Sequence, residues 1–425
     1  MSRAVAVLCA IIAATVVSAC DRPSTEPAQS PDAGLSLPAD YSGSGPGTLL
    51  AATSLPTLDR RLKAVTSVAA KVTYTSTSGV TNELTEVTGT VFAPKGVPPE
   101  GGWPILAYGH ATTGVAADCA PSSSPTLLNL STTILSLVNA GFVVAMSDYQ
   151  GLGNDRTYHP YLNAPTAGYN VIDSVRAARK VVADSSDRWV SFGVSQGGQG
   201  AWAANELSAE YGAGLTLVGS VSVSPPLDIA GFADAAADGT LTKDQQPAYQ
   251  ALLSALKHEY PNMNLDEYRR GIVQDSWDDF LKCDYARADE RTRLVDQITP
   301  DDLRPSTVEA TDTLRGWLAE ASLPRLPLAA PALVIYGGQD ALVPPAWTDM
   351  ALQRACEMGD VIRIDMQPDK GHSDVDVSPV MSWIGDRFRG VPAPDSCPSF
   401  ITPPPPPAPE EEEVEEVIVE EGEGE

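Results

Sequence analysis

One short segment, GVSQG at residues 193–197, constrains the fold of this chain more than any other feature. An apolar run at residues 189–192 precedes it, and a helical pattern begins near Gly198. Glycines two residues before and after a serine permit a sharp turn, because larger side chains there would collide with neighbouring elements. The pattern alone is weak in a chain with 34 glycines, but its context predicts a strand, a tight turn carrying Ser195, and a helix.

Short apolar runs alternate with longer helical patterns around this turn, which is typical of βαβ units in a mostly parallel sheet. In residues 168–183 the apolar side chains recur at helical spacing, which predicts a crossover helix packed on that sheet. The predicted strands span residues 88–92, 105–108, 142–147, 190–194, 218–223, 332–336 and 361–365. A serine turn between strand and helix in such a sheet predicts the α/β-hydrolase fold.

The strand pattern stops between residues 227 and 326, where helical stretches such as 249–260 and 265–283 dominate. A helical cap inserted between two strands accounts for this change. The sequence therefore predicts one hydrolase core in two parts, residues 61–226 and 327–400, interrupted by a helical cap at residues 227–326.

The amino-terminal segment has the features of an export signal. Arg3 is followed by an apolar run that ends in small residues, which predicts a signal peptide at residues 1–19. This run is shorter than the roughly 20 residues that a membrane-spanning helix needs. Cys20 lies where a bacterial lipobox would place a lipidated cysteine, so we expect an envelope lipoprotein, with simple secretion as the alternative. Membrane association would then depend on the lipid.

Both flanks of the core are expected to lack regular structure. Residues 20–60 are rich in Pro, Ser, Ala and Gly, which suits a flexible linker after the anchor. Residues 401–425 include a polyproline stretch and then consist almost entirely of glutamate, which predicts a disordered tail. Neither flank is expected to carry chemistry.

The formal net charge of -27 limits the possible partners. Ten of the negative charges lie in the last sixteen residues, and the rest of the chain is still acidic. Because no basic stripe offsets this charge, nucleic acid is not an expected partner, and a neutral or cationic substrate is favoured over an anionic one. No cofactor is suggested, and the cysteine spacing does not resemble a zinc site.

Four cysteines remain after the predicted leader and its lipidated residue: Cys119, Cys283, Cys356 and Cys397. An even number of cysteines in an oxidising compartment predicts disulfide bonds. The spacing alone leaves all three connectivities open.

A serine hydroxyl needs a base to accept its proton, and the chain contains four histidines. The order in this fold is serine, acid, histidine, which excludes His110 and His159 as the base. His258 falls in the predicted cap, whereas His372 lies on a loop between the last predicted strand and a helical pattern at residues 378–388. We therefore expect His372 to be the base.

The acid that orients the histidine is expected just after a strand that precedes it. Asp340 follows the predicted strand at 332–336 and a pair of glycines that free the backbone. Asp228, after the preceding strand, is the rival, and Asp374 is too close to His372 in sequence to approach it from behind. We favour Asp340, which completes a serine, histidine and aspartate triad.

Negative charge develops on the substrate carbonyl oxygen during acylation, and the backbone N–H of Gln196 is the expected first donor to it. A second donor should come from one of two loops that follow strands, residues 108–114 or 147–153. His110 and His159 lie in or near these loops. Structural hydrogen bonding is as reasonable for them as a catalytic role.

With these residues in view, the chain resembles the secretory lipase family. The resemblance rests on the DYQGLG loop at residues 148–153, the DSVRAA segment at 173–178, the serine turn, and the Gly-His pair at 371–372. It spans roughly residues 60–400, including the predicted cap. It implies hydrolysis of triacylglycerols or other carboxylic esters beneath a helical lid.

The resemblance also implies roles for individual residues. Asp148 would supply a side-chain donor to the oxyanion hole, and a carboxyl group can donate only when protonated, a form that burial favours. Cys119 would pair with Cys283, and Cys356 with Cys397. The first bridge would tie cap to core, and the second would lie near the carboxyl terminus.

Three functions follow from this reading. An exported serine esterase or lipase that acts through an acyl-enzyme is the leading one. A serine exopeptidase of the same fold would keep the triad but would need a site for a charged peptide terminus. An inactive, surface-tethered binding protein is the third, although a dead site has no chemical reason to keep the serine, acid, histidine order.

Overall fold

The computed structural model describes residues 34–283 and 288–401. The predicted signal peptide, Cys20 and all but the first residue of the predicted tail lie outside the described residues. Among the helices that are described, none is both long and apolar enough to cross a lipid bilayer.

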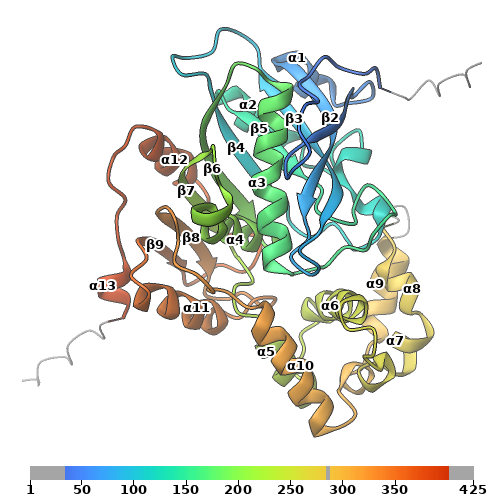
Figure 1. Cartoon of the computed structure of the whole chain (residues 1–425). Coiled ribbons are helices and arrows are strands. Elements are labelled where there is room, and N and C mark those ends of the chain that lie inside the picture. The colour runs from blue at the N-terminus through green and yellow to red at the C-terminus, as the bar shows by residue number, and fades with distance from the viewer. Residues whose placement is uncertain (1–33, 284–287, 402–425) are drawn as a thin grey trace, which may run out of the picture. The chain divides into compact units, whose positions relative to one another are not determined.

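A single mixed sheet organises the described part of the chain (Figure 1). Its nine described strands lie in the order β1-β2-β3-β5-β4-β6-β7-β8-β9. Pairing is antiparallel from β1 to β5 through β3 and parallel from β5 through β9. The predicted α/β class with a mostly parallel sheet is confirmed. The strands are β1 (Leu49–Ser54), β2 (Thr66–Thr77), β3 (Leu84–Pro94), β4 (Trp103–Gly109), β5 (Val143–Ser147), β6 (Ser185–Val194), β7 (Thr216–Val223), β8 (Ala332–Gly337) and β9 (Ile362–Gln367).

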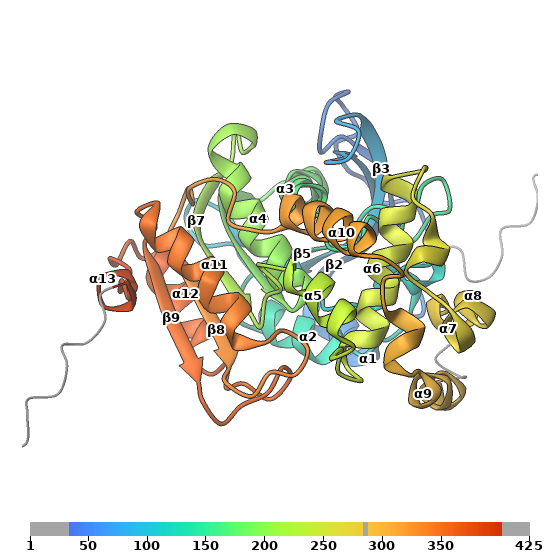
Figure 2. The ribbon, with the colours of Figure 1, turned by 90° about the horizontal axis from the view of Figure 1, so that it is seen from below.

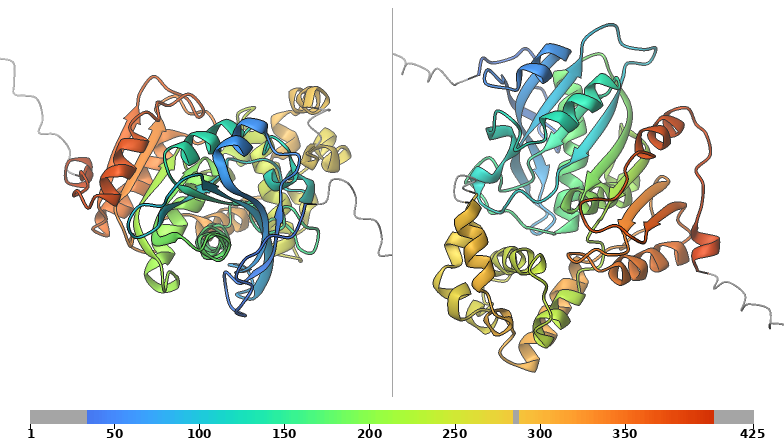
Figure 3. Two further views of the ribbon diagram at one scale, coloured as in Figure 1. Left: turned by 90° about the horizontal axis from the view of Figure 1, so that it is seen from above. Right: turned by 180° about the vertical axis from the view of Figure 1, so that it is seen from behind.

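Helices cover both faces of this sheet, because side chains along each strand alternate between the two faces and most of the parallel strands are apolar on both. On one face α3, α4 and α11 bury residues such as Val175, Trp202 and Leu352. The other face is covered by α2 and α12 (Figures 1 and 3). These two helices bury Ile134 and Trp383. The described helices are α1 (Arg60–Val65), α2 (Ser131–Asn139), α3 (Ala164–Val181), α4 (Gln196–Tyr211), α5 (Gly231–Asp238), α6 (Gln245–Glu259), α7 (Gly271–Asp275), α8 (Trp277–Leu281), α9 (Ala288–Gln297), α10 (Val308–Ala321), α11 (Pro345–Glu357), α12 (Val380–Phe388) and α13 (Cys397–Phe400).

Two antiparallel strands at one edge of the sheet differ from the expectation. The predicted linker at residues 20–60 is too long, because residues 49–54 form β1 and pair with β2. This segment is rich in Ala and Thr, and only Leu49 and Ala52 are buried, so its apolar content does not mark a strand. β2 was also missed, although its buried Val72 and Tyr74 alternate with polar residues.

The chain between β7 and β8 is helical in the described residues and contains α5 to α10, gathered at one end of the sheet (Figures 1 and 2). These helices share a buried apolar cluster that includes Tyr249, Leu253 and Leu314. The helical stretch expected at residues 265–283 is interrupted rather than continuous. The helical turns are interrupted after Glu267 and again at Ser276, and α7 begins at Gly271, whose φ of +52° belongs to the left-handed region that glycine tolerates best.

Candidate active site

Ser195 occupies a sharp turn between β6 and α4. Its backbone angles are φ 54° and ψ -122°, a sparsely populated combination for a residue with a side chain. Gly193 and Gly197 make the turn possible. A Cβ atom on Gly193 would lie 1.9 Å from the carbonyl oxygen of Gly197, and one on Gly197 would lie 2.0 Å from that of Gly109. The structure thus gives the geometric reason for both glycines of the motif.

Backbone hydrogen bonds hold this turn in place. The N–H of Ser195 donates to the carbonyl oxygen of Val223 on β7 at 2.8 Å, and the N–H of Gln199 donates to the carbonyl oxygen of Ser195 at 3.1 Å. Strained backbone of this kind costs on the order of 1–3 kcal/mol and persists only where the surroundings fix it. The turn is therefore anchored both to the sheet and to the first turn of α4.

The structure brings Ser195, His372 and Asp340 into one hydrogen-bonded chain. The Nε2 atom of His372 lies 2.9 Å from the Oγ atom of Ser195, and its Nδ1 atom lies 2.7 Å from Oδ2 of Asp340. Each residue follows a parallel strand, and the carboxyl ends of parallel strands meet at one edge of the sheet. The loop that carries His372 is tied down by the hydroxyl of Ser224, which donates to the His372 carbonyl oxygen at 2.8 Å.

The surroundings of Asp340 fix the proton arrangement of this chain. Its other oxygen, Oδ1, accepts hydrogen bonds from the backbone N–H groups of Leu342 and Val343, at 2.9 and 2.8 Å. These donors favour an acceptor-only carboxylate, which takes a proton donor from Nδ1 of His372. In a neutral imidazole the Nε2 atom is then an unprotonated acceptor that faces the Ser195 hydroxyl. This is the arrangement required of a base.

The rival residues lie elsewhere. Asp228 accepts a hydrogen bond from the N–H of Ala230 and pairs with Arg354, whose Nη2 is 2.9 Å from its Oδ2. Asp374 accepts a hydrogen bond from the N–H of Gly371 at 2.6 Å and so folds its own loop. His258 stacks on Tyr158 at the end of α6, with ring centroids 4.6 Å apart. None of these three side chains is hydrogen-bonded to His372 in the described part of the chain.

A cavity of about 470 Å³ opens beside Ser195 and His372. Its core side is formed by residues 111–115 and Tyr161. Its other side comes from the helices between β7 and β8, including Ala251 on α6 and Phe280 on α8. The volume lies within the range of about 300–1,000 Å³ that is usual for small-molecule sites.

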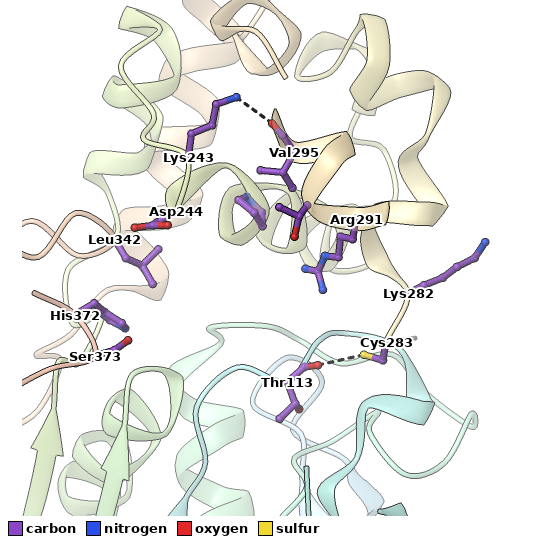
Figure 4. A pocket seen from close by; sticks show the side chains of 12 residues that line it. Thr113, Lys243, Asp244, Lys282, Cys283, Arg291, Val295, Leu342, His372 and Ser373 are labelled. Atoms are coloured by element: carbon purple, nitrogen blue, oxygen red, sulfur yellow. Dashed lines mark hydrogen bonds between the residues drawn. The ribbon is translucent and has the colours of Figure 1, made fainter. Parts of the chain in front are cut away.

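A second pocket, of about 580 Å³, adjoins the first and shares His372 and Ser373 with it (Figure 4). Arg291 extends from α9 into this pocket. The ammonium of Lys243 turns away and donates to the carbonyl oxygen of Val295 at 3.0 Å. Lys282 also points outward, away from the pocket.

Both disulfide bonds join the cysteines that the family resemblance pairs. Cys119 is bonded to Cys283, and Cys356 to Cys397. The first bridge fastens the segment after α8 to the loop at residues 111–119, which borders the cavity. Asp118, Cys119 and Cys283 are the described acidic and cysteine side chains close enough together to suggest a metal ion, but bonded sulfurs offer no thiolate.

The two predicted oxyanion donors, Gln196 and Asp148, differ in their position relative to Ser195 and the cavity. Gln196 is the first residue of α4, so its backbone N–H has no partner within the helix and lies directly after Ser195. Asp148 is fully buried, and its carboxylate oxygens accept hydrogen bonds from the N–H of Ser122 at 2.9 Å and the hydroxyl of Thr88 at 2.6 Å. Asp148 is not among the described residues that line the cavity beside Ser195. Both assignments stay predictions.

The two loops proposed to supply a second oxyanion donor lie at different distances from the cavity. The loop at residues 108–114 borders the cavity, whereas the loop at 147–153 lies beneath it, and the hydroxyl of Tyr149 donates to the carbonyl oxygen of His110 at 3.2 Å. Burial lowers the pKa of His110, and it lowers that of His159 to about 4. Both imidazoles are therefore neutral near neutral pH.

Residues that line the cavity from the helical segment were not found by sequence reasoning. Ala251, Phe280 and Arg291 lie in ordinary helical patterns, and their approach to Ser195 depends on tertiary packing. Thr112 and Thr113 carried a usable signal, because they follow a predicted strand directly after His110. The disulfide also marks this loop.

Comparison with known proteins agrees with this geometry. Residues 122–396, more than half of the chain, match the family model described as secretory lipase. A Mycobacterium tuberculosis protein named as a probable inactive lipase is 30% identical over 241 residues, which cover 53% of this chain and 51% of that protein. The chain thus spans about half the length of this curated relative.

Solved structures share the fold. The closed state of Candida antarctica lipase A superposes with a TM-score of 0.66 at 17% identity, over 84% of this chain and 86% of that one. The rice cell wall degrading esterase LipA from Xanthomonas oryzae gives a TM-score of 0.63 at 22% identity, over 82% of this chain and 97% of that one. On the match to the family model, the chain belongs to the secretory lipase family.

Proposed function

We propose that this protein is an exported serine carboxylic ester hydrolase that acts through an acyl-enzyme on acylglycerols or smaller acyl esters. The observation that carries the proposal is the hydrogen-bonded chain from Ser195 through His372 to Asp340, which ends beside a cavity. Membership of the family supports the reaction class, and the geometry of these three residues supports the mechanism.

In the first half of the reaction Ser195 is the nucleophile. Its Oγ attacks the ester carbonyl carbon while its proton passes to Nε2 of His372, and the carboxylate of Asp340 stabilises the resulting imidazolium. The negative charge that forms on the carbonyl oxygen is met by the backbone N–H of Gln196, at the positive end of α4. The protonated His372 then donates its proton to the departing alcohol oxygen.

In the second half water replaces the alcohol. His372 takes a proton from the water, the hydroxide attacks the acyl carbon, and the same donors meet the charge on the carbonyl oxygen. Collapse of this intermediate releases the carboxylic acid and returns the proton to Ser195. The free enzyme is thereby restored without a cofactor.

The domain boundaries belong to the same proposal. Residues 61–226 and 327–400 would form the hydrolase core, and residues 227–326 would form a cap that encloses the acyl group. Contacts of Ala251 and Phe280 with the cavity support this assignment, because they bring apolar surface from the helical segment to the reacting serine.

Export is also part of the proposal. Two disulfide bonds suit an oxidising compartment, where they form and persist. Removal of a signal peptide at residues 1–19 and lipidation of Cys20 rest on the sequence alone. Metabolic labelling with a palmitate analogue, comparing the natural chain with Cys20→Ala, would separate an envelope lipoprotein from a secreted enzyme.

Hydrolysis of p-nitrophenyl esters from acetyl to palmitoyl tests the activity. We expect turnover by the purified protein and a loss of about 10⁶-fold in kcat for Ser195→Ala, because removing the nucleophile of a triad removes the acyl-enzyme route. Ser136→Ala, which changes an exposed serine of α2, is the matched control and should keep full activity.

Two outcomes would point to the other functions. Inactivity on every ester, with cleavage of aminoacyl p-nitroanilides that is lost in Ser195→Ala, would identify a serine exopeptidase. Inactivity on both substrate classes would place the chain with its Mycobacterium tuberculosis relative named as inactive.

A further inference from the structure

A buried histidine that the proposed mechanism does not use lies behind the serine turn. The Nδ1 atom of His159 is 2.9 Å from the carbonyl oxygen of Gln150, and its Nε2 atom is 2.8 Å from Nε2 of Gln196. All three residues are buried. His159 therefore connects the loop at residues 147–153 to the residue that directly follows Ser195.

The partners of His159 determine which of its nitrogens carries the proton. A carbonyl oxygen can only accept, so the ring must donate to Gln150 through Nδ1–H. In a neutral ring Nε2 is then an acceptor, and it needs a donor, which the side-chain NH₂ of Gln196 supplies. Burial holds the pKa of His159 at about 4, so the ring stays neutral in ordinary conditions.

This contact also fixes the side-chain amide of Gln196. Its nitrogen must face His159, because its oxygen would otherwise meet the lone pair of Nε2. The amide oxygen of Gln196 is buried and has no hydrogen-bond partner in the described part of the chain. The bond to His159 is thus the polar contact that holds this side chain in the described part of the chain.

The loop behind His159 is anchored by a hydrogen bond and by close backbone packing. The N–H of Gln150 donates to Oδ1 of Asn170 on α3 at 2.7 Å, and Gly151 packs directly on the backbone before His159. A Cβ atom on Gly151 would lie 2.1 Å from the carbonyl carbon of Tyr158. The DYQGLG loop therefore packs directly against the segment that carries His159.

The position of Gln196 matters for chemistry because of the strained turn. Its backbone N–H belongs to the peptide plane between Ser195 and Gln196, and the orientation of that plane depends on the ψ angle of Ser195, which is -122°. Relaxation of this angle would turn the N–H away from the place where the substrate oxyanion forms. A tether on the Gln196 side chain resists that rotation.

We propose that His159 is a positioning residue, which holds Gln196 so that its backbone N–H remains aimed at the oxyanion. It touches neither substrate nor nucleophile and acts through the Gln196 side chain. The inference rests on the proposed esterase function, and it assigns to the DYQGLG loop the role of carrying this support.

Two substitutions of His159 separate positioning from simple packing. His159→Gln keeps an oxygen acceptor at the distance of Nε2, within reach of Gln196, but gives up the bond to Gln150. His159→Asn keeps a donor at the place of Nδ1 and gives up the bond to Gln196. Both remove part of the buried ring, so both are expected to lower the unfolding temperature.

Steady-state hydrolysis of p-nitrophenyl butyrate is the measurement. We expect His159→Asn to lower kcat by about 10- to 100-fold with KM changed less than about twofold, since losing an oxyanion donor outright costs about 10²–10³. His159→Gln should retain kcat within about threefold of the natural enzyme. Gln196→Met should lower kcat as His159→Asn does, and combining the two should add little, because both break one contact.

The outcomes are distinguishable. Equal losses of kcat in His159→Asn and His159→Gln that follow their unfolding temperatures, or additive losses in the double variant, would overturn the positioning role while leaving the esterase function intact. An inactive natural enzyme would overturn the esterase function and, with it, this inference.

Discussion

At the scale of single residues, both carboxylate oxygens of Asp340 are held by hydrogen bonds. One carboxylate oxygen accepts from His372, and the other accepts from two backbone N–H groups. Its side chain is only 2% exposed, so these contacts are shielded from competition by water. A buried carboxylate is tolerated when its oxygens are satisfied in this way.

Replacing this carboxylate by an amide should cost most of the activity. Asp340→Asn keeps the shape, but its NH₂ group cannot accept from Nδ1 of His372, so the wrong tautomer is favoured. We expect kcat for p-nitrophenyl butyrate to fall by about 10⁴-fold. Asp228→Asn is the matched control; it weakens the contact with Arg354 and should lower the unfolding temperature while kcat stays within a few fold. The reverse pattern would make Asp228 the acid.

The predictability of the site differs from residue to residue. Ser195 and His372, whose side chains the structure places 2.9 Å apart, could be proposed because a chain with four histidines and a fixed serine, acid, histidine order leaves few choices. The contact between His159 and Gln196 could not be predicted, because it joins a loop to the first residue of α4 and both side chains are buried. Phe280 reaches the cavity only through packing of the helical segment.

At the scale of elements, the two disulfide bonds connect different parts of the structure. Cys119 and Cys283 join the loop at 111–119 to the segment after α8, where the cavity lies. Cys356 and Cys397 join the end of α11 to α13, beside β9 at the edge of the sheet (Figure 1), and neither cysteine lines the cavity. Both should stabilise the fold, but only the first should shape the site.

Removing each bridge in turn tests this difference. Replacing both cysteines of either bridge by alanine should lower the free energy of unfolding by about 2–5 kcal/mol. The variant without the 119–283 bridge should also show a KM for p-nitrophenyl butyrate raised severalfold, because Thr113 and Gly114 line the cavity. The variant without the 356–397 bridge should keep its KM. Equal effects on KM would show that the first bridge has no special part in the site.

Burial of Glu259, at the end of α6, makes the stability depend on pH. The side chain of Asn163, which caps α3, opposes this effect because it favours the charged carboxylate. Burial raises the pKa of Glu259 to about 7 from its ordinary value of 4.5. The folded state therefore binds a proton more tightly than the unfolded state, so stability decreases as pH rises from about 4.5 to about 7.

Glu259→Gln should remove this part of the pH dependence. The variant should match the natural protein near pH 4.5 and exceed its stability above about pH 7 by on the order of 2 kcal/mol. Thermal unfolding across this range is the measurement, with the exposed Glu210→Gln as a control for the change in net charge. A constant difference between the two glutamine variants at all pH values would contradict the raised pKa.

For the whole molecule, the sequence predicted the parallel half of the sheet better than the antiparallel half. Strands such as β5 and β8 are buried on both faces and read as continuous apolar runs. β1 and β2 mix small and polar residues, and their place depends on pairing with distant segments. The helical stretch expected at 265–283 is divided at two places, and Gly271, at the start of α7, has a left-handed backbone that an uninterrupted helix does not contain.

The net charge of -27 should act on every charged substrate that approaches the cavity. The expected result is a lower kcat/KM for the p-nitrophenyl monoester of a dicarboxylic acid than for a neutral ester of equal length. Raising the ionic strength from about 10 mM to about 150 mM should reduce the difference in kcat/KM between the two esters. Salt screens the repulsion between the acidic protein and the anionic ester. An anionic ester that is preferred at low salt would instead indicate local recognition by a group such as Arg291.

Trapping the covalent intermediate tests the central claim most directly. The protein is incubated with a p-nitrophenyl alkylphosphonate, which reacts as an ester does but is not released by water, and the adduct is located by intact mass and peptide mapping. We predict one adduct per chain, on Ser195, absent in Ser195→Ala and formed much more slowly in His372→Ala. A protein that forms no adduct, or that is modified at another residue, would contradict the assignment of Ser195 as the nucleophile.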